Sequence, residues 1–142
     1  MEPRISLVTL GVSDLRRSVK FYQDDLGWNT TFTEGDPIAF FRLRGLVLGL
    51  YERRALAADV NVSPEGNGFR GITLAHNVRS RRAVVAIFAR LRRRGASIVK
   101  PPRATDWGGF SGYFADPDNH LWEVAHNPGW KLDRNGAVVL PK

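Results

Sequence analysis

The sequence has 142 residues, 43% of them hydrophobic, and a formal net charge of +7 at neutral pH. A chain of this length supplies one hydrophobic core, so we expect one domain rather than two independent ones. The absence of cysteine excludes disulfides, thiolate nucleophiles and sulfur-ligated metals. Residues 1–20 hold no apolar run long enough for a signal peptide or a membrane span, so we expect a cytoplasmic protein that does not bind membranes.

Much of the positive charge lies in arginines that bracket one apolar stretch. A solvated helix face explains this cluster more simply than a nucleic-acid surface, because none of the usual nucleic-acid motifs accompanies it. We therefore expect no nucleic-acid partner. The arginines concerned are Arg79, Arg81, Arg82, Arg90, Arg92, Arg93 and Arg94.

The first half of the chain predicts a strand, a helix and three more strands. Residues 5–12 read as a buried strand, and Ser13 offers an N-cap to a helix that Gly27 ends. This helix has one apolar stripe that can cover a sheet, made of Leu15, Val19, Tyr22 and Leu26. Three short strands are expected next, at residues 28–33, 38–43 and 46–51.

The second half repeats this order after a turn-rich segment. Residues 71–78 predict a strand, and Ser80 precedes a helix that Gly95 ends. The apolar stripe of this helix consists of Val84, Ile87, Phe88 and Leu91. Three further strands are expected at residues 96–99, 110–115 and 120–125, the last two joined by the turn Asp116-Pro117-Asp118-Asn119.

The repeat predicts an α+β fold in which two tandem βαβββ modules form a curved mixed sheet around a cleft. We expect a single domain with module one at about residues 4–52, a linker at 53–69, module two at about 70–126 and a C-terminal tail at 127–142. In the tail, a turn at Asn135-Gly136 precedes the apolar residues 137–140. This tail is either an added hairpin or a dimer contact.

Two stretches carry a specific likeness to a known family. One is Val12-Ser13-Asp14-Leu15 followed by Phe21-Tyr22 and Leu26-Gly27-Trp28, and the other runs from Gly112 to Glu123 and includes Asp116-Pro117-Asp118-Asn119-His120. Both resemble the vicinal oxygen chelate superfamily, which contains glyoxalases, bleomycin-resistance proteins and extradiol dioxygenases. With the repeat between them, the likeness spans about 125 residues and implies a glyoxalase-like domain.

In the metal-dependent members of this superfamily, ligands come from the first strand of each module, as His or Gln, and from the last strand, as Glu. Glu123 matches the last-strand position of module two. Leu7 stands at the first-strand position of module one, and residues 48–50 supply no donor near its last strand, although Glu52 lies just beyond. The first strand of module two aligns in two ways, which place either Thr73 or His76 at the ligand position.

A metal centre with open positions needs three or more protein nitrogen or oxygen donors, and this chain supplies about two. The resemblance therefore implies either no cofactor or a divalent metal held in an incomplete site by Glu123 and His76.

Glu123 and His76 are also the candidate catalytic residues. Glu123 is a general base or an anionic anchor, or alternatively it forms a salt bridge with Arg42. His76 is an acid–base group or a metal ligand, or alternatively a structural hydrogen-bonding residue. His120 follows a turn and is expected to face solvent, and His126 is not a good candidate because it begins the exit from the last strand.

Several rings beside the strands are candidates to line the cleft as substrate-binding residues, although core packing is the default explanation for them. Trp107 stands out because the neighbouring Gly108-Gly109 pair permits a loop that carries the indole toward a pocket mouth. The substrate-binding candidates are Trp107, Phe110, Phe40, Tyr51, Arg42 and Trp122.

Three functional hypotheses follow, since the fold alone does not choose among the chemistries of the superfamily. The first is a protein with an aromatic-lined cleft that binds a small organic molecule without a complete metal site. The second is a divalent-metal-dependent enzyme resembling lactoylglutathione lyases or dioxygenases. The third is a drug-binding resistance protein without catalysis, so the sequence does not decide whether the chain is an enzyme. The resemblance also implies a homodimer.

Overall fold

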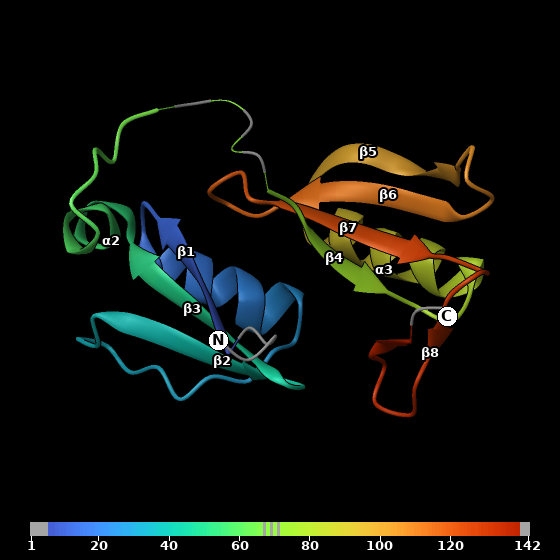
Figure 1. The fold of residues 1–142 in the computed structure, drawn as a ribbon. Coiled ribbons are helices and arrows are strands. Elements are labelled where there is room, and N and C mark those ends of the chain that lie inside the picture. The colour runs from blue at the N-terminus through green and yellow to red at the C-terminus, as the bar shows by residue number, and fades with distance from the viewer. Residues whose placement is uncertain (1–5, 67, 69, 71, 140–142) are drawn as a thin grey trace. The chain divides into compact units, whose positions relative to one another are not determined.

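The computed structural model describes residues 6–66, 68, 70 and 72–139. The chain divides into two compact units, residues 1–70 and 71–142, and each is described by itself (Figure 1). The division falls next to the end of the predicted linker, and the single domain stays a prediction. Ile5, Asn67, Gly71 and Leu140, which belong to predicted strands and turns, lie outside the described residues.

The first unit contains a mixed three-stranded sheet. Its strands are β1 (Leu7–Val12), β2 (Ile38–Leu43) and β3 (Leu46–Glu52) in the order β1-β3-β2. β1 runs parallel to β3, and β2 runs antiparallel to it. These strands confirm three of the four that the first half predicts.

The predicted strand at residues 28–33 is wrong, because only Thr30 pairs there, in an isolated bridge to Phe41. The Thr30 hydroxyl donates to the Phe40 carbonyl at 2.8 Å and accepts the Phe32 N–H at 3.1 Å. Such local side-chain bonds compete with a strand ladder. Trp28 packs against Tyr22, with the ring centroids 5.6 Å apart.

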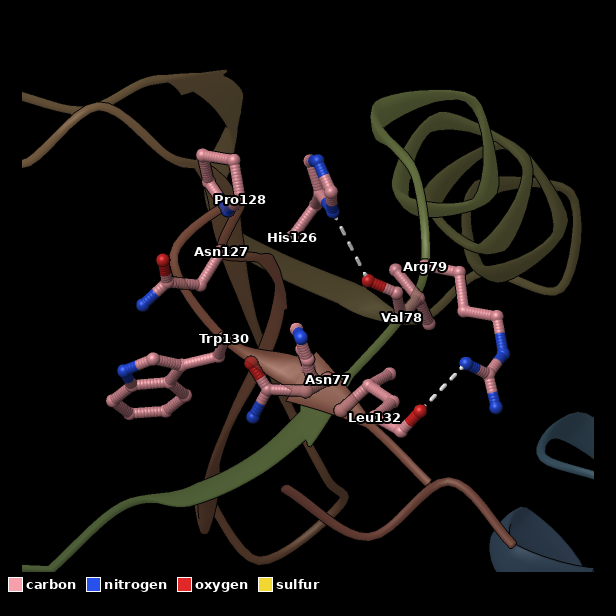
Figure 2. A pocket seen from close by; sticks show the side chains of 9 residues that line it. Asn77, Val78, Arg79, His126, Asn127, Pro128, Trp130 and Leu132 are labelled. Atoms are coloured by element: carbon pink, nitrogen blue, oxygen red, sulfur yellow. Dashed lines mark hydrogen bonds between the residues drawn. The ribbon is translucent and has the colours of Figure 1, made fainter. Parts of the chain in front are cut away.

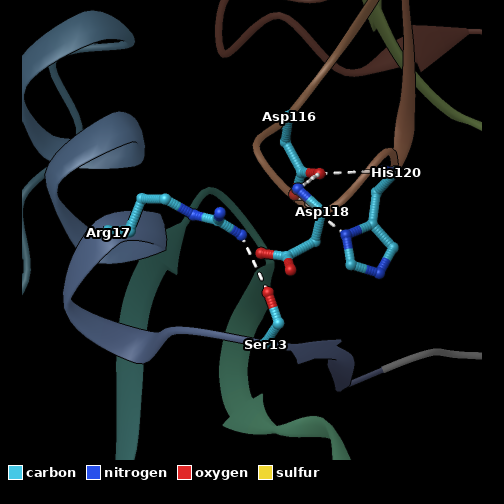
Figure 3. A network of polar contacts seen from close by, with 5 residues as sticks. All are labelled: Ser13, Arg17, Asp116, Asp118 and His120. Carbon is cyan, nitrogen blue, oxygen red and sulfur yellow. Dashed lines mark hydrogen bonds and ion pairs between the residues drawn. The ribbon is translucent and has the colours of Figure 1, made fainter.

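The helical segment of this unit begins one residue later than the sequence suggests. The Asp14 carboxylate, rather than the Ser13 hydroxyl, accepts the Arg17 backbone N–H at 3.0 Å and caps α1 (Leu15–Lys20). Ser13 instead accepts a bond from the Arg17 guanidinium at 2.8 Å (Figure 3). A π-helical turn, η1 (Phe21–Asp25), continues α1.

A second helix, α2 (Arg53–Asp59), occupies the start of the segment predicted to be a linker. The Glu52 carboxylate caps it by accepting the Ala55 N–H at 2.7 Å. Backbone hydrogen bonds, first from Arg54 and then from Ala55, lower the pKa of Glu52 below its ordinary value. α2 has no clear signal in the sequence, because the segment is short and its apolar pattern covers less than two turns.

The second unit contains a four-stranded sheet and the longest helix. Its elements are β4 (Leu74–Asn77), α3 (Arg81–Arg93), β5 (Ser97–Ala104), β6 (Phe110–Ala115) and β7 (Leu121–His126), with strand order β4-β7-β6-β5. Ser80 caps α3, as predicted, by accepting the Ala83 N–H at 3.2 Å. β5 extends well beyond the predicted residues 96–99 despite two prolines, because it is an edge strand with register shifts.

α3 covers one face of this sheet (Figure 1). Its buried residues Val84, Phe88 and Leu91 form the predicted stripe. The Phe88 ring packs edge-on against Phe114 with centroids 6.4 Å apart, and Phe114 stacks on Trp122 at 6.3 Å. The other side of α3 is exposed, with Arg82, Arg90, Arg92 and Arg93 on it, as a solvated helix face requires.

The tail forms the predicted hairpin, from β8 (Lys131–Leu132) and β9 (Val138–Val139). The turn between them contains Gly136 at φ +87, and the Asp133 carboxylate accepts the N–H groups of Asn135 and Ala137 at 2.8 and 2.9 Å. A dimer contact by this tail stays a prediction. The two units together confirm the α+β class, and no helix in the described part of the chain could cross a membrane.

α3 lies close to the sheet at Gly112. A Cβ atom there would lie 2.7 Å from both the Phe88 ring and the Lys100 carbonyl oxygen. Gly112→Ala should therefore lower the free energy of unfolding by about 1–3 kcal/mol, measured by chemical denaturation. The matched control is Gly129→Ala, whose nearest contact would be the Asn127 side chain at 3.3 Å and which should cost less than about 0.5 kcal/mol. Equal losses in the two variants would contradict the close approach.

Candidate functional site

The strand register assigns each side chain of the second sheet to one of two faces. Trp122 and Val124 are buried on the face that α3 covers. Because side chains alternate along a strand, Glu123 points to the opposite face, which we call the reverse face. Tyr113 lies beside Glu123 on β6, and Lys100 lies beside Tyr113 on β5. Three polar side chains thus form a row across neighbouring strands.

Tyr113 and Glu123 interact directly within this row. The pKa of the Tyr113 hydroxyl lies above its ordinary value, first because burial disfavours the phenolate, then because of the negative charge of Glu123 and a side-chain hydrogen bond to it. The phenol is therefore protonated at neutral pH and donates to the carboxylate. This bond offsets part of the cost of holding a carboxylate at a partly buried position.

Lys100 adds a positive charge to the row. Its ammonium group lies 5.8 Å from the centroid of the Tyr113 ring, within the range of a cation–π contact. A carboxylate, a phenol and an ammonium group are thus spaced one strand apart. Together they can accept a hydrogen bond from a ligand, donate one to it, and attract an anionic group.

His76 lies on the other side of the sheet from Glu123. In the β4–β7 register His76 pairs with Val124, whereas Ala75 pairs with Glu123, so His76 belongs to the α3 face. The pairing of His76 with Glu123 as catalytic or metal-binding partners is therefore corrected, because alternation along adjacent strands separates them. His76 keeps exposed surface, yet burial lowers the pKa of its imidazole below the ordinary value.

Two further candidates also belong to the α3 face. Trp122 is 6% exposed and stacks on Phe114, so it is part of the core. Phe110 pairs with Ala104 and lies under the Arg81 guanidinium, 5.8 Å from the ring centroid. Neither ring lines the reverse face, because Trp122 is part of the core and Phe110 is half-buried beneath Arg81.

Trp107 lies in the loop between β5 and β6, where 53% of its surface is exposed. Its indole lies across Gly109, where an added Cβ would overlap the ring. The Thr105 hydroxyl accepts the Gly109 N–H at 3.0 Å and closes the loop. The indole can occupy this position because Gly109 has no side chain.

The remaining candidates, Phe40, Tyr51 and Arg42, lie in the first unit. They alternate with the buried Ala39, Phe41 and Leu50, so they occupy the sheet face opposite the α1 side. Gly49 shares this face, because a Cβ there would lie 3.3 Å from the Thr9 hydroxyl and 3.5 Å from the Phe40 ring. Leu7 also lies on this face, because its side chain would be 3.6 Å from the same added Cβ.

The family ligand positions hold few donors. In the first unit, Leu7 and Gly49 lie on the sheet face opposite the α1 side, and neither side chain can bind a metal. The Glu52 carboxylate instead caps α2. In the second unit the alternation that places Ala75 beside Glu123 selects Thr73 rather than His76 as the matching position. Among the described residues no three His, Asp or Glu side chains are grouped to hold a metal ion. This donor set does not fit the divalent metal of the superfamily.

Sequence reasoning missed Tyr113 and Lys100. Tyr113 could have been found by pairing residues outward from the predicted turn at 116–119, which sets it opposite Glu123. Lys100 could not, since a register shift between Ile98 and Lys100 decides its position.

The expectation that His120 faces solvent is wrong. Its side chain is 15% exposed, and its Nδ1 lies 2.9 Å from the Asp116 carboxylate (Figure 3). The carboxylate also accepts the His120 backbone N–H, so this residue belongs to the turn.

The raised pKa of Tyr113 predicts a late alkaline transition. Tyrosinate absorbance should show one hydroxyl titrating above the ordinary tyrosine pKa of about 10, and Tyr113→Phe should remove it. Glu123→Gln should move it only part of the way down, because burial is the largest cause. The folded state holds this proton more tightly, so its contribution to stability is full below pH of about 10 and is lost as pH rises through the raised pKa. An unchanged late transition in Tyr113→Phe would refute the assignment.

Comparison with known proteins agrees with this architecture. A glyoxalase-related enzyme from Fulvimarina pelagi is 35% identical, with 99% of each chain covered and a TM-score of 0.87. A glyoxalase/bleomycin resistance protein/dioxygenase from Nocardioides is 26% identical over 94% of this chain and 91% of its own, with a TM-score of 0.75. A lactoylglutathione lyase from Agrobacterium tumefaciens, 19% identical over 94% of this chain and 100% of its own with a TM-score of 0.72, shares the fold.

No significant match was found among curated proteins. The sequence profile of the Glyoxalase/Bleomycin resistance protein/Dioxygenase superfamily, however, matches residues 4–124, which is most of the chain. The chain therefore belongs to the Glyoxalase/Bleomycin resistance protein/Dioxygenase superfamily.

Proposed function

We propose that this protein binds a small organic molecule at the reverse face of the second sheet, and that it does so without a chelated metal ion. The observation that carries the proposal is the row of Lys100, Tyr113 and Glu123 on three adjacent strands. A site of this kind needs a few polar groups in fixed positions, and strands hold such groups more rigidly than loops.

The chemistry of the row favours a particular class of ligand. Glu123 accepts one bond from Tyr113, and a carboxylate has about four acceptor positions, so it can accept further bonds from a hydroxyl or amino group. Lys100 attracts an acidic group, and the overall charge of +7 raises the local concentration of anions. The ligand we propose is a small organic acid that also carries a hydroxyl or amino group.

The second hypothesis, a divalent-metal lyase or dioxygenase, has less support. The support for it is that a lactoylglutathione lyase shares the fold, but at 19% identity this likeness concerns the fold alone. At the family ligand positions the chain has one carboxylate, Glu123, and otherwise Leu7, Gly49 and Thr73. These residues supply fewer donors than a divalent metal needs. The third hypothesis, drug binding without catalysis, would use the same site as our proposal and differs from it in the ligand that is bound.

Ligand binding should depend on the charge of Glu123. A library of small hydroxy and amino acids would be screened against the full chain by ligand-detected NMR, and the hits measured by calorimetry. Glu123→Gln should weaken them about tenfold or more, since it removes a charged hydrogen-bond acceptor. Glu65→Gln, an exposed carboxylate in the first unit, is the matched control and should leave the affinity unchanged. Hits that bind both variants equally well would rule out the proposed site.

Metal binding gives an independent test. Titration of the protein with Zn²⁺ or Ni²⁺ should show no one-to-one site tighter than about 1 μM, because Glu123 alone cannot supply the coordination. Glu123→Gln and Glu65→Gln should therefore give the same titration as the unaltered protein. A stoichiometric site that Glu123→Gln abolishes and Glu65→Gln preserves would overturn the metal-free proposal and favour the lyase or dioxygenase reading.

A further inference from the structure

The tail of the second unit borders an open cavity of about 380 Å³ (Figure 2). Its lining does not include Lys100, Tyr113 or Glu123. This volume lies within the range of small-molecule sites. It is lined by Asn77, Val78, Arg79, His126, Asn127, Pro128, Trp130, Lys131 and Leu132. The lining comes from the ends of β4 and β7 and from the chain that leaves them.

Hydrogen bonds fix the walls of this cavity. The Arg79 guanidinium donates to the Leu132 carbonyl at 2.9 Å and also to the Asp133 carbonyl, which ties the tail hairpin to the end of β4 (Figure 2). The Val78 N–H donates to the Ala125 carbonyl at 2.8 Å and extends the β4–β7 pairing. The tail is therefore attached to the sheet rather than free, and the cavity is preformed.

His126 forms part of this framework. Its Nδ1 lies 3.2 Å from the Val78 carbonyl oxygen (Figure 2). A carbonyl oxygen only accepts, so Nδ1 carries the proton of this bond and Nε2 keeps its lone pair when the ring is neutral. The bond fixes the orientation of the ring in the wall of the cavity.

The charge of the cavity is positive. Arg79 and Lys131 contribute cations, and none of the described residues that line it is Asp or Glu. The nearest acid along the chain, Asp133, directs its carboxylate to the N–H groups of Asn135 and Ala137 in the hairpin turn. An anionic ligand would therefore meet attraction without a competing carboxylate in the wall.

The apolar part of the lining suits a planar ring. Trp130, which is 40% exposed, lines the cavity together with Pro128 and Leu132. The side chain of Asn127 has its oxygen bonded to the Gly129 N–H at 2.9 Å, which leaves its NH₂ group available as a donor. Stacking on an indole and pairing with a cation are together the requirements of an aromatic acid.

We propose that the tail cavity is a binding site for a small aromatic carboxylate, with the ring against Trp130 and the carboxylate paired with Lys131. The proposal stands apart from the function proposed for the reverse face, because Glu123, Tyr113 and Lys100 are not among the described residues that line the cavity.

The test uses benzoate and its neutral analogue benzamide as probes, followed by NMR of the full chain. Benzoate should shift the Trp130 indole N–H and the backbone N–H groups of Asn127 and Lys131, and benzamide should bind about tenfold more weakly because it lacks the charge. Lys131→Met keeps the aliphatic stem and should weaken benzoate about tenfold. Lys20→Met removes an exposed lysine from α1 and should change nothing.

Two further variants separate this site from the reverse face. Trp130→Ala should weaken benzoate about fivefold or more through lost stacking, whereas Lys100→Met, which removes the cation of the reverse face, should have no effect. Equal affinity for benzoate and benzamide, or equal benzoate affinity in Lys131→Met and the unaltered protein, would overturn the proposal. So would loss of benzoate binding in Lys100→Met, since it would locate the acid on the reverse face.

Discussion

The pairing of β6 with β7 across a single tight turn is the constraint on which the second unit depends. Asp116, only 2% exposed, holds that turn by accepting the backbone N–H groups of Asp118 and His120 at 2.9 and 2.8 Å. A slip of one residue would exchange the two faces, moving Glu123 into the core and Trp122 out of it. The turn therefore decides which side chains pack and which are available for chemistry.

The two faces obey different physical rules. On the α3 side, Phe88, Phe114 and Trp122 exclude water, and their packing leaves no room at Gly112 for a side chain. On the reverse side, Tyr113 and Glu123 are only partly buried and are stabilised by a hydrogen bond and by the solvent that still reaches them. The core thus fixes the strands, and the strands fix the spacing of the polar row.

The chain retains the superfamily fold, but its residues at the family ligand positions supply too few donors for a metal ion. Gly49 illustrates the physical reason in the first unit. An added Cβ there would come within 3.3 Å of the Thr9 hydroxyl and 3.5 Å of the Phe40 ring, so a side chain at this position would require these neighbours to shift slightly. Position 49 supplies no donor, and Leu7 on the neighbouring strand supplies none either. A fold shared with a lyase thus says little about the reaction, because function depends on these few positions.

The repeat, the two capped or glycine-terminated helices and most of the strands follow from local patterns in the sequence. Ser80, Gly27 and Gly95 act through local backbone geometry, and apolar periodicity is likewise a local property. The sequence also singles out Glu123 as a candidate and shows the scarcity of metal donors, because both depend on the residue type at motif positions.

The face that each candidate occupies depends on tertiary contacts. His76 is separated from Glu123 by the β4–β7 register, and Lys100 reaches Tyr113 through a register shift in β5. His126 lines a cavity whose other wall is the tail, which the hydrogen bond from Arg79 to the Leu132 carbonyl attaches to the sheet. Register and long-range attachment arise from contacts between residues far apart in the chain, and no local pattern in the sequence encodes them.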